Sequence, residues 1–78
     1  MEYYGTVSGI FAQATRGSEP RCQAYIHEDD SHFIQVTTTY LNLQSALELA
    51  SLKNCKVEVS YEESGGTNYL QRVRLFDR

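Results

Sequence analysis

The residues best suited to chemistry in this sequence are two histidines that flank a short acidic run. His27 and His32 enclose the segment EDDS at positions 28–31. Imidazole nitrogens and carboxylate oxygens together form a ligand set that zinc and other first-row metals accept. The same composition is typical of an exposed turn, because Asp and Ser side chains bond to nearby backbone N–H groups. We favour the turn, and we predict no metal site and no cofactor.

The two cysteines, Cys22 and Cys55, offer a second kind of chemistry. They lack the paired spacing of a zinc site, and no histidine is arranged beside either of them to generate a thiolate. Two readings stay open: a disulfide, as in small secreted domains, or two buried free thiols, as in cytosolic ones. No phosphate-binding glycine loop opens a helix. We therefore predict that the protein is not an enzyme.

The charge of the chain bears on its partners. The net charge is −3, with seven scattered Lys and Arg residues. Nucleic-acid binding normally requires a basic patch, so we predict no nucleic-acid partner. No apolar run approaches the ~20 residues of a membrane span. The start, MEYYGTVSG, lacks the apolar core of a signal peptide. We expect a mature secreted chain in which Met1 replaces the leader, or a cytoplasmic protein if no leader exists.

The elements that position these residues follow from hydrophobic periodicity. Alternation bounded by turn residues predicts five strands, over residues 3–16, 21–27, 32–39, 56–61 and 69–76. Gly5 and Gly9 predict that the first strand is long and bent. In the last strand, Tyr69, Val73 and Leu75 are expected on one face. The segment EESGGTN is expected to be a turn or flexible loop between the last two strands.

A single helix is predicted over residues 42–53. Asn42 is a suitable N-cap, and Asn54 follows as a C-terminal signal. Apolar residues lie at spacings of three and four: Leu43, Ala46, Leu47 and Ala50. A helix this short is not stable alone, so it must pack on the sheet.

Three strands, one helix and two strands make the order of an OB-fold, which is a five-stranded Greek-key barrel with a helix between strands three and four. We predict one such domain over residues 1–78. An SH3-like barrel lacks the helix, and a ferredoxin-like fold needs two. OB-folds bind single-stranded nucleic acids or oligosaccharides. Tyr25 and Phe33 could stack on a ligand from an outer face, or they could belong to an oligomer interface.

The segment NLQSALELASLKNCKVEVSYEESGG, residues 42–66, resembles the B subunit of Shiga-type toxins. The likeness lies in Asn-Leu-Gln at the helix start, a helix rich in Leu, Ser and Ala, a Val-rich strand and a glycine run. The start YYGTVSG also resembles that family. Further along, GSEPRCQAYI resembles a segment of subtilase-cytotoxin-like and typhoid-toxin-like B subunits, with Pro20 placed two residues before Cys22.

The resemblance implies a non-catalytic toxin subunit that binds cell-surface glycans, on a glycolipid or a glycoprotein, and carries a catalytic A subunit. It also implies a homopentamer whose helices line a central pore. The residues expected on that pore or oligomer surface are Leu43, Ala46, Leu49 and Ala50.

The glycan site implied by the resemblance draws on three segments. These are the turn between the first two strands, the segment before the helix, and the glycine run. Its expected residues are Ser18, Arg21, Thr39, Tyr40, Gly65 and Gly66. By its likeness to the second group of toxins, Ser18 is expected to contact a sialic-acid-like carboxylate.

This chain departs from the Shiga-type pattern at the sugar-binding positions. Leu41 stands where that family has a stacking tryptophan, Tyr40 where it has arginine, and Thr37 where it has phenylalanine. Glu2 and Ser64 occupy the positions of its disulfide. The departures imply that the sugar differs or that sugar binding is lost. The alternative function is a cytosolic OB-fold protein-interaction or oligomerisation module, and a single-stranded nucleic-acid binder ranks below both.

Overall fold

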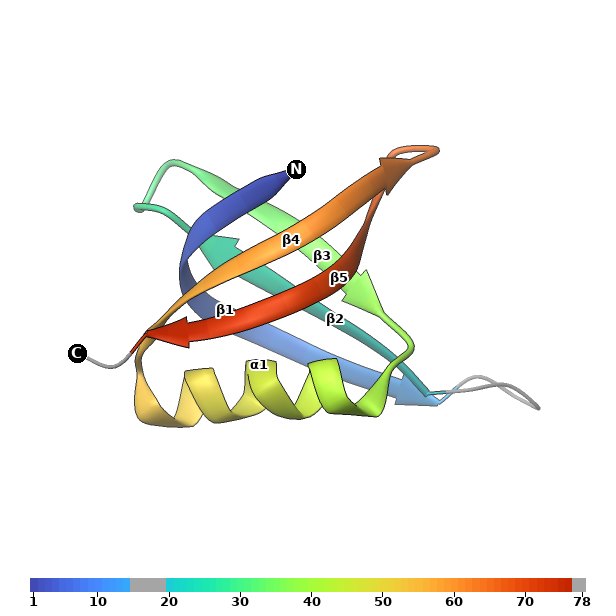
Figure 1. The fold of residues 1–78 in the computed structure, drawn as a ribbon, viewed down its shortest axis with the longest axis horizontal. Helices are drawn as coiled ribbons and strands as arrows, with labels where there is room; N and C mark the ends of the chain where they lie inside the picture. The colour runs from blue at the N-terminus through green and yellow to red at the C-terminus, as the bar shows by residue number, and fades with distance from the viewer. Residues whose placement is uncertain (15–19, 77–78) are drawn as a thin grey trace.

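The computed structural model describes the backbone of residues 1–14 and 20–76, and the side chains of residues 1–10 and 22–76. Its elements are β1 (Glu2–Ala14), β2 (Pro20–His27), β3 (Phe33–Thr38), α1 (Leu41–Lys53), β4 (Lys56–Ser64) and β5 (Thr67–Phe76). The strands close into a barrel in the order β1-β2-β3-β5-β4, and α1 lies across one end (Figure 1). The predicted OB-fold-like architecture is confirmed.

Strand β1 is shared between two parts of the barrel. Its start, Glu2–Thr6, pairs with β4, and from Thr6 onward it pairs with β2. The register shifts between Ser8 and Phe11, around Gly9, whose φ of 61° favours glycine. At Gly5 an added Cβ would collide with the backbone carbonyl of His27. The predicted long, bent first strand is confirmed, and glycine is required at both places.

The core follows the predicted alternation in β2 and β4. Cys22, Ala24 and Ile26 of β2 point inward, as do Val57 and Val59 of β4. Strand β3 adds its own inward residues, with Val36 fully buried and Ile34 half-buried. Burial of these branched side chains is the main stabilising term of so small a barrel.

The predicted faces of β5 are wrong in the first half of the strand. Tyr69 is 50% exposed, whereas Leu70 is buried. The cause is a β-bulge, because Ser60 pairs with Arg72 but Tyr61 pairs with Leu70, which leaves Gln71 as an extra residue. One extra residue reverses which side chains face inward.

The end of β4 and the start of β5 are more regular than expected. The strands continue to Ser64 and from Thr67, so only Gly65 and Gly66 form the turn. Both glycines have positive φ, 59° and 83°, as a two-residue hairpin turn that follows the twist of the strands requires. Of the turn or flexible loop expected over EESGGTN, the structure contains a turn, and it is confined to Gly65 and Gly66.

Helix α1 begins one residue earlier than predicted, and its N-cap is Tyr40 rather than Asn42. Tyr40 supplies no side-chain cap, but its own N–H donates to the Thr38 hydroxyl at 3.1 Å. The predicted C-terminus is confirmed. Asn54 is left-handed, and the N–H groups of Asn54 and Cys55 donate to Ser51 and Ala50. This double closure is a Schellman motif.

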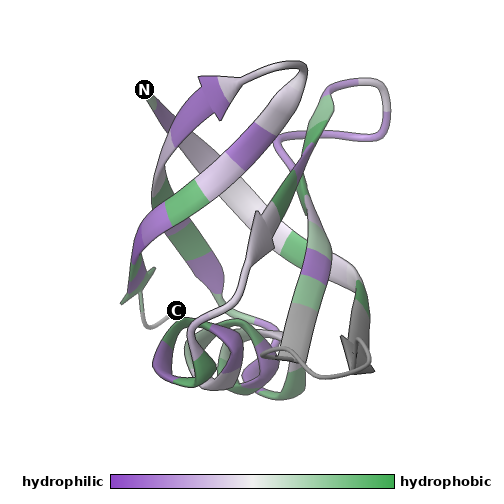
Figure 2. Cartoon of the chain, turned by 90° about the vertical axis from the view of Figure 1, so that its right-hand side faces the viewer, coloured by the Kyte–Doolittle hydropathy of each residue, from purple (hydrophilic) through white to green (hydrophobic). Residues whose placement is uncertain are grey.

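The helix plugs the barrel through one face and exposes apolar residues on another. Leu47 and Ala50 are buried, whereas Leu41, Leu49 and Leu52 are exposed. Apolar residues are therefore spread around the helix and are not confined to the face that packs on the barrel, as the interspersed green and purple segments of the helix in Figure 2 show. Ala50, which the resemblance places on the pore surface, has no exposed area and packs in the core of the barrel instead. No helix in the described residues is long and apolar enough to cross a membrane.

The barrel closes weakly between β3 and β5. These strands are parallel and meet in a single register pair, Thr37 with Tyr69. Within the described residues, β1 beyond Thr6 pairs only with β2, and β5 beyond Tyr69 pairs only with β4. Two strand edges thus have no strand beside them.

The plug can be tested with two leucines of the same helix. Replacing Leu47, 1% exposed, by Ala should lower the free energy of unfolding by about 2–5 kcal/mol, because it leaves a cavity under the helix. Leu41→Ala, at a 61% exposed position of the same helix, should change it by no more than ~0.5 kcal/mol. Urea unfolding followed by circular dichroism measures both. Equal effects would show that Leu47 does not hold the helix to the barrel.

Candidate functional site

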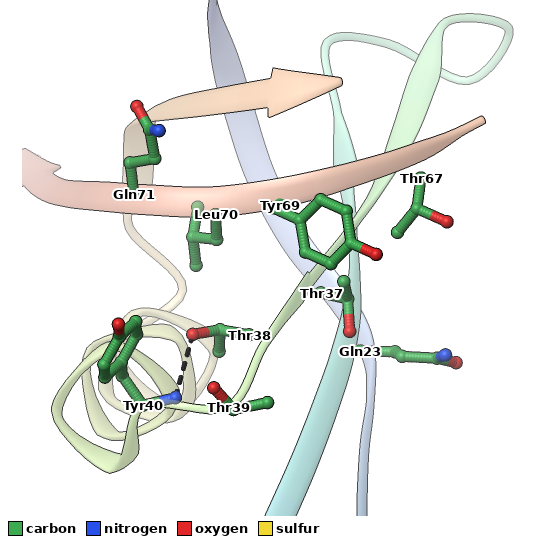
Figure 3. Close-up of a pocket in the computed structure, with 9 residues that line it drawn as sticks. All are labelled: Gln23, Thr37, Thr38, Thr39, Tyr40, Thr67, Tyr69, Leu70 and Gln71. Atoms are coloured by element: carbon green, nitrogen blue, oxygen red, sulfur yellow. Dashed lines mark hydrogen bonds between the residues drawn. The ribbon is translucent and has the colours of Figure 1, made fainter. Parts of the chain in front are cut away.

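A pocket within the described residues lies at the weak closure of the barrel. It has a volume of about 700 Å³ and opens between the end of β3, the start of α1 and β5 (Figure 3). Past the single Thr37–Tyr69 pair the two strands separate, and the chain turns away from β3 into the helix. The pocket is therefore a direct product of how this barrel closes.

The lining of the pocket is polar and uncharged. Threonine hydroxyls, glutamine amides and two tyrosines share it with a single leucine. The lining residues are Gln23, Thr37, Thr38, Thr39, Tyr40, Thr67, Tyr69, Leu70 and Gln71. Tyr40 and Tyr69 are 64% and 50% exposed and stand on opposite sides in Figure 3. Two aromatic faces around hydroxyls and amides suit a ligand that is itself partly apolar and rich in hydroxyls.

Internal hydrogen bonds hold several of these groups in place. The Thr37 hydroxyl donates to the Cys22 carbonyl at 3.1 Å, and the Gln71 amide donates to the Glu62 carboxylate at 2.8 Å. A threonine oxygen whose hydrogen is committed can still accept a bond from a ligand. These polar groups are thus positioned before any ligand arrives, which lowers the entropy cost of binding.

A second, smaller pocket of about 160 Å³ adjoins the first. The two share Gln23, Thr37 and Thr67, and the second adds Gln35, Val36, Gly66 and Asn68. The Asn68 amide donates to the Gln35 carbonyl at 2.9 Å, and the Gln35 amide donates to the Gln23 side chain at 3.2 Å. An amide-lined path therefore runs from the larger pocket across the outer face of β3.

The structure brings together part of the site expected from sequence. Thr39 and Tyr40 line the larger pocket, and Gly66 lines the smaller one. Gly65 lies in the neighbouring turn without lining either pocket. Ser18 lies outside the described residues. For Arg21 only the backbone is described, within β2 opposite Gln13.

Sequence reasoning missed the contribution of β5 to the pocket. The sequence pattern places Tyr69 on the same face as Val73 and Leu75, whereas the bulge at Gln71 turns it to the opposite face, beside Thr37. No sequence pattern identifies Gln23 and Thr67 as pocket residues, because a polar residue on a strand usually indicates only that this face of the strand is exposed to solvent. The excess of tyrosine, six in 78 residues, was the available hint.

The acidic segment between the histidines is a turn, as favoured. The Asp29 carboxylate accepts the N–H groups of Ser31 and His32 at 2.8 and 2.9 Å, and it contacts His32 Nδ1 at 2.9 Å. Within residues 1–14 and 20–76 no three His, Cys, Asp or Glu side chains gather around a metal position.

The cysteines are free thiols, and both are buried. Cys22 is 1% exposed, and burial, with a smaller contribution from the charge of Glu48, raises the pKa of its thiol. The Cys55 thiol points to the Ala50 carbonyl at 3.9 Å. Of the two open readings, the structure contains the buried thiols rather than the disulfide. A raised pKa and burial make Cys22 a poor nucleophile.

The turn should respond to pH through His32. Its hydrogen bond to Asp29 raises the His32 pKa above the ordinary 6.5, and the same bond lowers the Asp29 pKa below 3.8. The histidine contribution to stability is complete below pH 6.5 and is lost as pH rises through the raised pKa. The aspartate contribution exists above pH 3.8 and is lost as pH falls through the lowered pKa. In Asp29→Asn the His32 pKa, followed by NMR titration, should fall. An unchanged value would contradict the pairing.

Comparison of the chain with protein-family models, with curated proteins and with solved structures finds no match. The barrel and its pocket are therefore the basis on which function must be inferred.

Proposed function

We propose that this chain is a non-catalytic glycan-binding subunit that assembles into a ring, in the manner of toxin B subunits. Its binding site is the seam pocket, which we define by the larger pocket at the closure of β3 and β5. The proposal also includes a cell-surface oligosaccharide as ligand, a pentamer as the assembly, and a catalytic A subunit as partner. Secretion follows from these roles.

The observation that carries the proposal is the lining of the seam pocket. Tyr40 and Tyr69 offer faces for the apolar side of a sugar ring, and the threonines and glutamines offer partners for its hydroxyls. The pocket also lies where OB-folds bind ligands, on β2 and β3 and beside the loop between β4 and β5. No described lining residue is charged, which disfavours a nucleic acid or a phosphorylated ligand.

The departures from the Shiga-type pattern acquire a physical meaning at this pocket. Leu41, at the tryptophan position, is 61% exposed and is not among the lining residues. Tyr40, at the arginine position, does line it. The aromatic residue at the pocket, Tyr40, thus lies one position earlier in this chain than the tryptophan of the Shiga-type pattern. This supports retained sugar binding with a changed specificity over lost sugar binding.

Ring assembly is supported by the two strand edges without partners. The second half of β1 and the second half of β5 are different surfaces, and both run along the helix end of the barrel (Figure 1). Pairing the β1 edge of one copy with the β5 edge of the next is a head-to-tail contact, which closes into a ring when the rotation permits. It would also cover edges that otherwise invite aggregation.

The exposed helix face supports the same assembly. Leu49 and Leu52 are 46% and 85% exposed beside the half-buried Leu43 and Ala46. In a ring these side chains would meet those of neighbouring copies or of a bound partner segment, and their burial would stabilise the complex.

A second candidate is a cytosolic OB-fold interaction module without sugar binding. The observation that favours it is the pair of buried free thiols, Cys22 and Cys55, which suits a reducing compartment. It would use the same exposed leucines for protein contacts, and the seam pocket would have no glycan ligand.

The glycan site can be tested with neighbouring residues of similar exposure. Tyr40→Ala should weaken binding on a broad glycan array by about tenfold or more, equivalent to ~1.4 kcal/mol, because a stacking face is lost. Leu41→Ala should leave binding unchanged, since Leu41 does not line the pocket. Absence of binding by the unaltered protein to every glycan would overturn the proposed site.

The ring can be tested by light scattering. The unaltered chain should have five times the mass of the 8.9 kDa monomer. Leu49→Glu should shift it toward the monomer, because charge is introduced into an apolar contact. Ser51→Glu, which adds the same charge at another exposed helix position, should keep the mass. A monomeric mass for the unaltered protein across concentrations contradicts the ring.

A further inference from the structure

The outer face of the β2–β3 hairpin carries an aromatic cluster that neither the core nor the seam pocket uses. Tyr25 and His27 of β2 and Phe33 of β3 form it. The Phe33 ring lies 5.8 Å from that of Tyr25 and 5.1 Å from that of His27. Phe33 is 52% exposed. We call these three residues the aromatic platform.

The aromatic platform continues the path that begins in the seam pocket. On the outer face of β2 and β3, opposite residues pair as Gln23 with Thr37, Tyr25 with Gln35, and His27 with Phe33. The first pair lines both pockets, and Gln35 lines the smaller one. From Gln23 to His27 is four residues of strand, roughly 13 Å at ~3.3 Å per residue. The pocket, the amide-lined path and the platform thus lie in one row.

The chemistry along this row alternates in a way that suits a chain of sugars. The pocket combines tyrosine faces with hydroxyls, the middle is amide-lined, and the far end offers rings again. A pyranose has one apolar face and a rim of hydroxyls, so it can stack at either end and donate or accept hydrogen bonds between them. One monosaccharide cannot occupy both ends.

The charge at the far end restricts the ligand further. The turn that joins His27 to Phe33 carries Glu28, Asp29 and Asp30, all exposed, and only the Asp29 carboxylate is paired with a histidine, His32. At physiological salt such carboxylates repel an anion that approaches within about 8 Å. Sialylated or sulfated sugars are disfavoured at the platform, as is single-stranded nucleic acid.

We propose that the aromatic platform is a second subsite of the glycan site, which binds an uncharged sugar unit of a chain whose first unit occupies the seam pocket. This inference rests on the proposed glycan function and specifies its ligand as a neutral oligosaccharide of at least three units.

The experiment compares glycan length and charge on the same protein. An array carries neutral mono- to hexasaccharides of several core series, each neutral chain beside its sialylated form, and a fluorescent oligothymidine is titrated separately. The variants are Phe33→Ala, Tyr40→Ala and the control Tyr4→Ala, an exposed tyrosine on the outer face of β1. Because Phe33 contributes little to the core, its variant should fold, and circular dichroism checks this.

The expected result is about tenfold tighter binding of neutral chains of three or more units than of their terminal mono- or disaccharides. Phe33→Ala should abolish that gain and leave the short glycans unchanged, Tyr40→Ala should weaken short and long chains alike, and Tyr4→Ala should change neither.

Two results overturn the platform while leaving the glycan function intact. One is a length gain that survives Phe33→Ala or is absent from the unaltered protein, and the other is preference for sialylated chains. Binding to no glycan, or tight binding to oligothymidine instead, overturns the glycan function and the platform together.

Discussion

The closure of the barrel between β3 and β5 is the constraint on which the rest of this structure depends. Each of the other neighbouring strand pairs is antiparallel and extends over several residues, but β3 and β5 are parallel and share a single register pair, Thr37 with Tyr69. Parallel strands cannot be joined by a tight turn, so the chain must cross over between them. Here the crossover includes α1, which then lies across the barrel end. A wider closure would leave no room for the pocket beside that pair.

The helix makes the narrow closure stable. Its ends are fixed by backbone geometry, through the Thr38 hydroxyl at the start and the left-handed Asn54 at the finish. Leu47 and Ala50 then fill the open end of the barrel. The same elements set the position of Tyr40, which is the last residue before the helix and a wall of the pocket. Stability and the candidate site thus share one segment of chain.

Local patterns predicted most of the fold. Alternation placed Cys22, Ala24 and Ile26 inward correctly, and the order of elements was sufficient for the barrel. The prediction failed where a single residue changed the register, as Gln71 does in β5. The only mark of this bulge in the sequence is the pair of polar residues, Gln71 and Arg72, between Leu70 and Val73, and the aromatic Tyr69 fits an uninterrupted alternation equally well. The candidate site was only half predictable for a related reason. Thr39 and Tyr40 adjoin a helix start that can be recognised, whereas Tyr69 joins them through a long-range pairing that no local pattern encodes.

The missing side chain at Gly5 has a consequence for how such a barrel can diversify. There the backbone of β1 lies directly against the backbone of His27 and Glu28, with no room for a Cβ between them. The position of the end of β2 relative to β1 is thereby set by main-chain contact rather than by the side chains on the outer face. Outward positions such as Tyr25 and Phe33 can then exchange residue types without moving the surface beneath them. A single glycine thus allows the backbone of this surface to stay constant while the side chains that determine what the surface binds change.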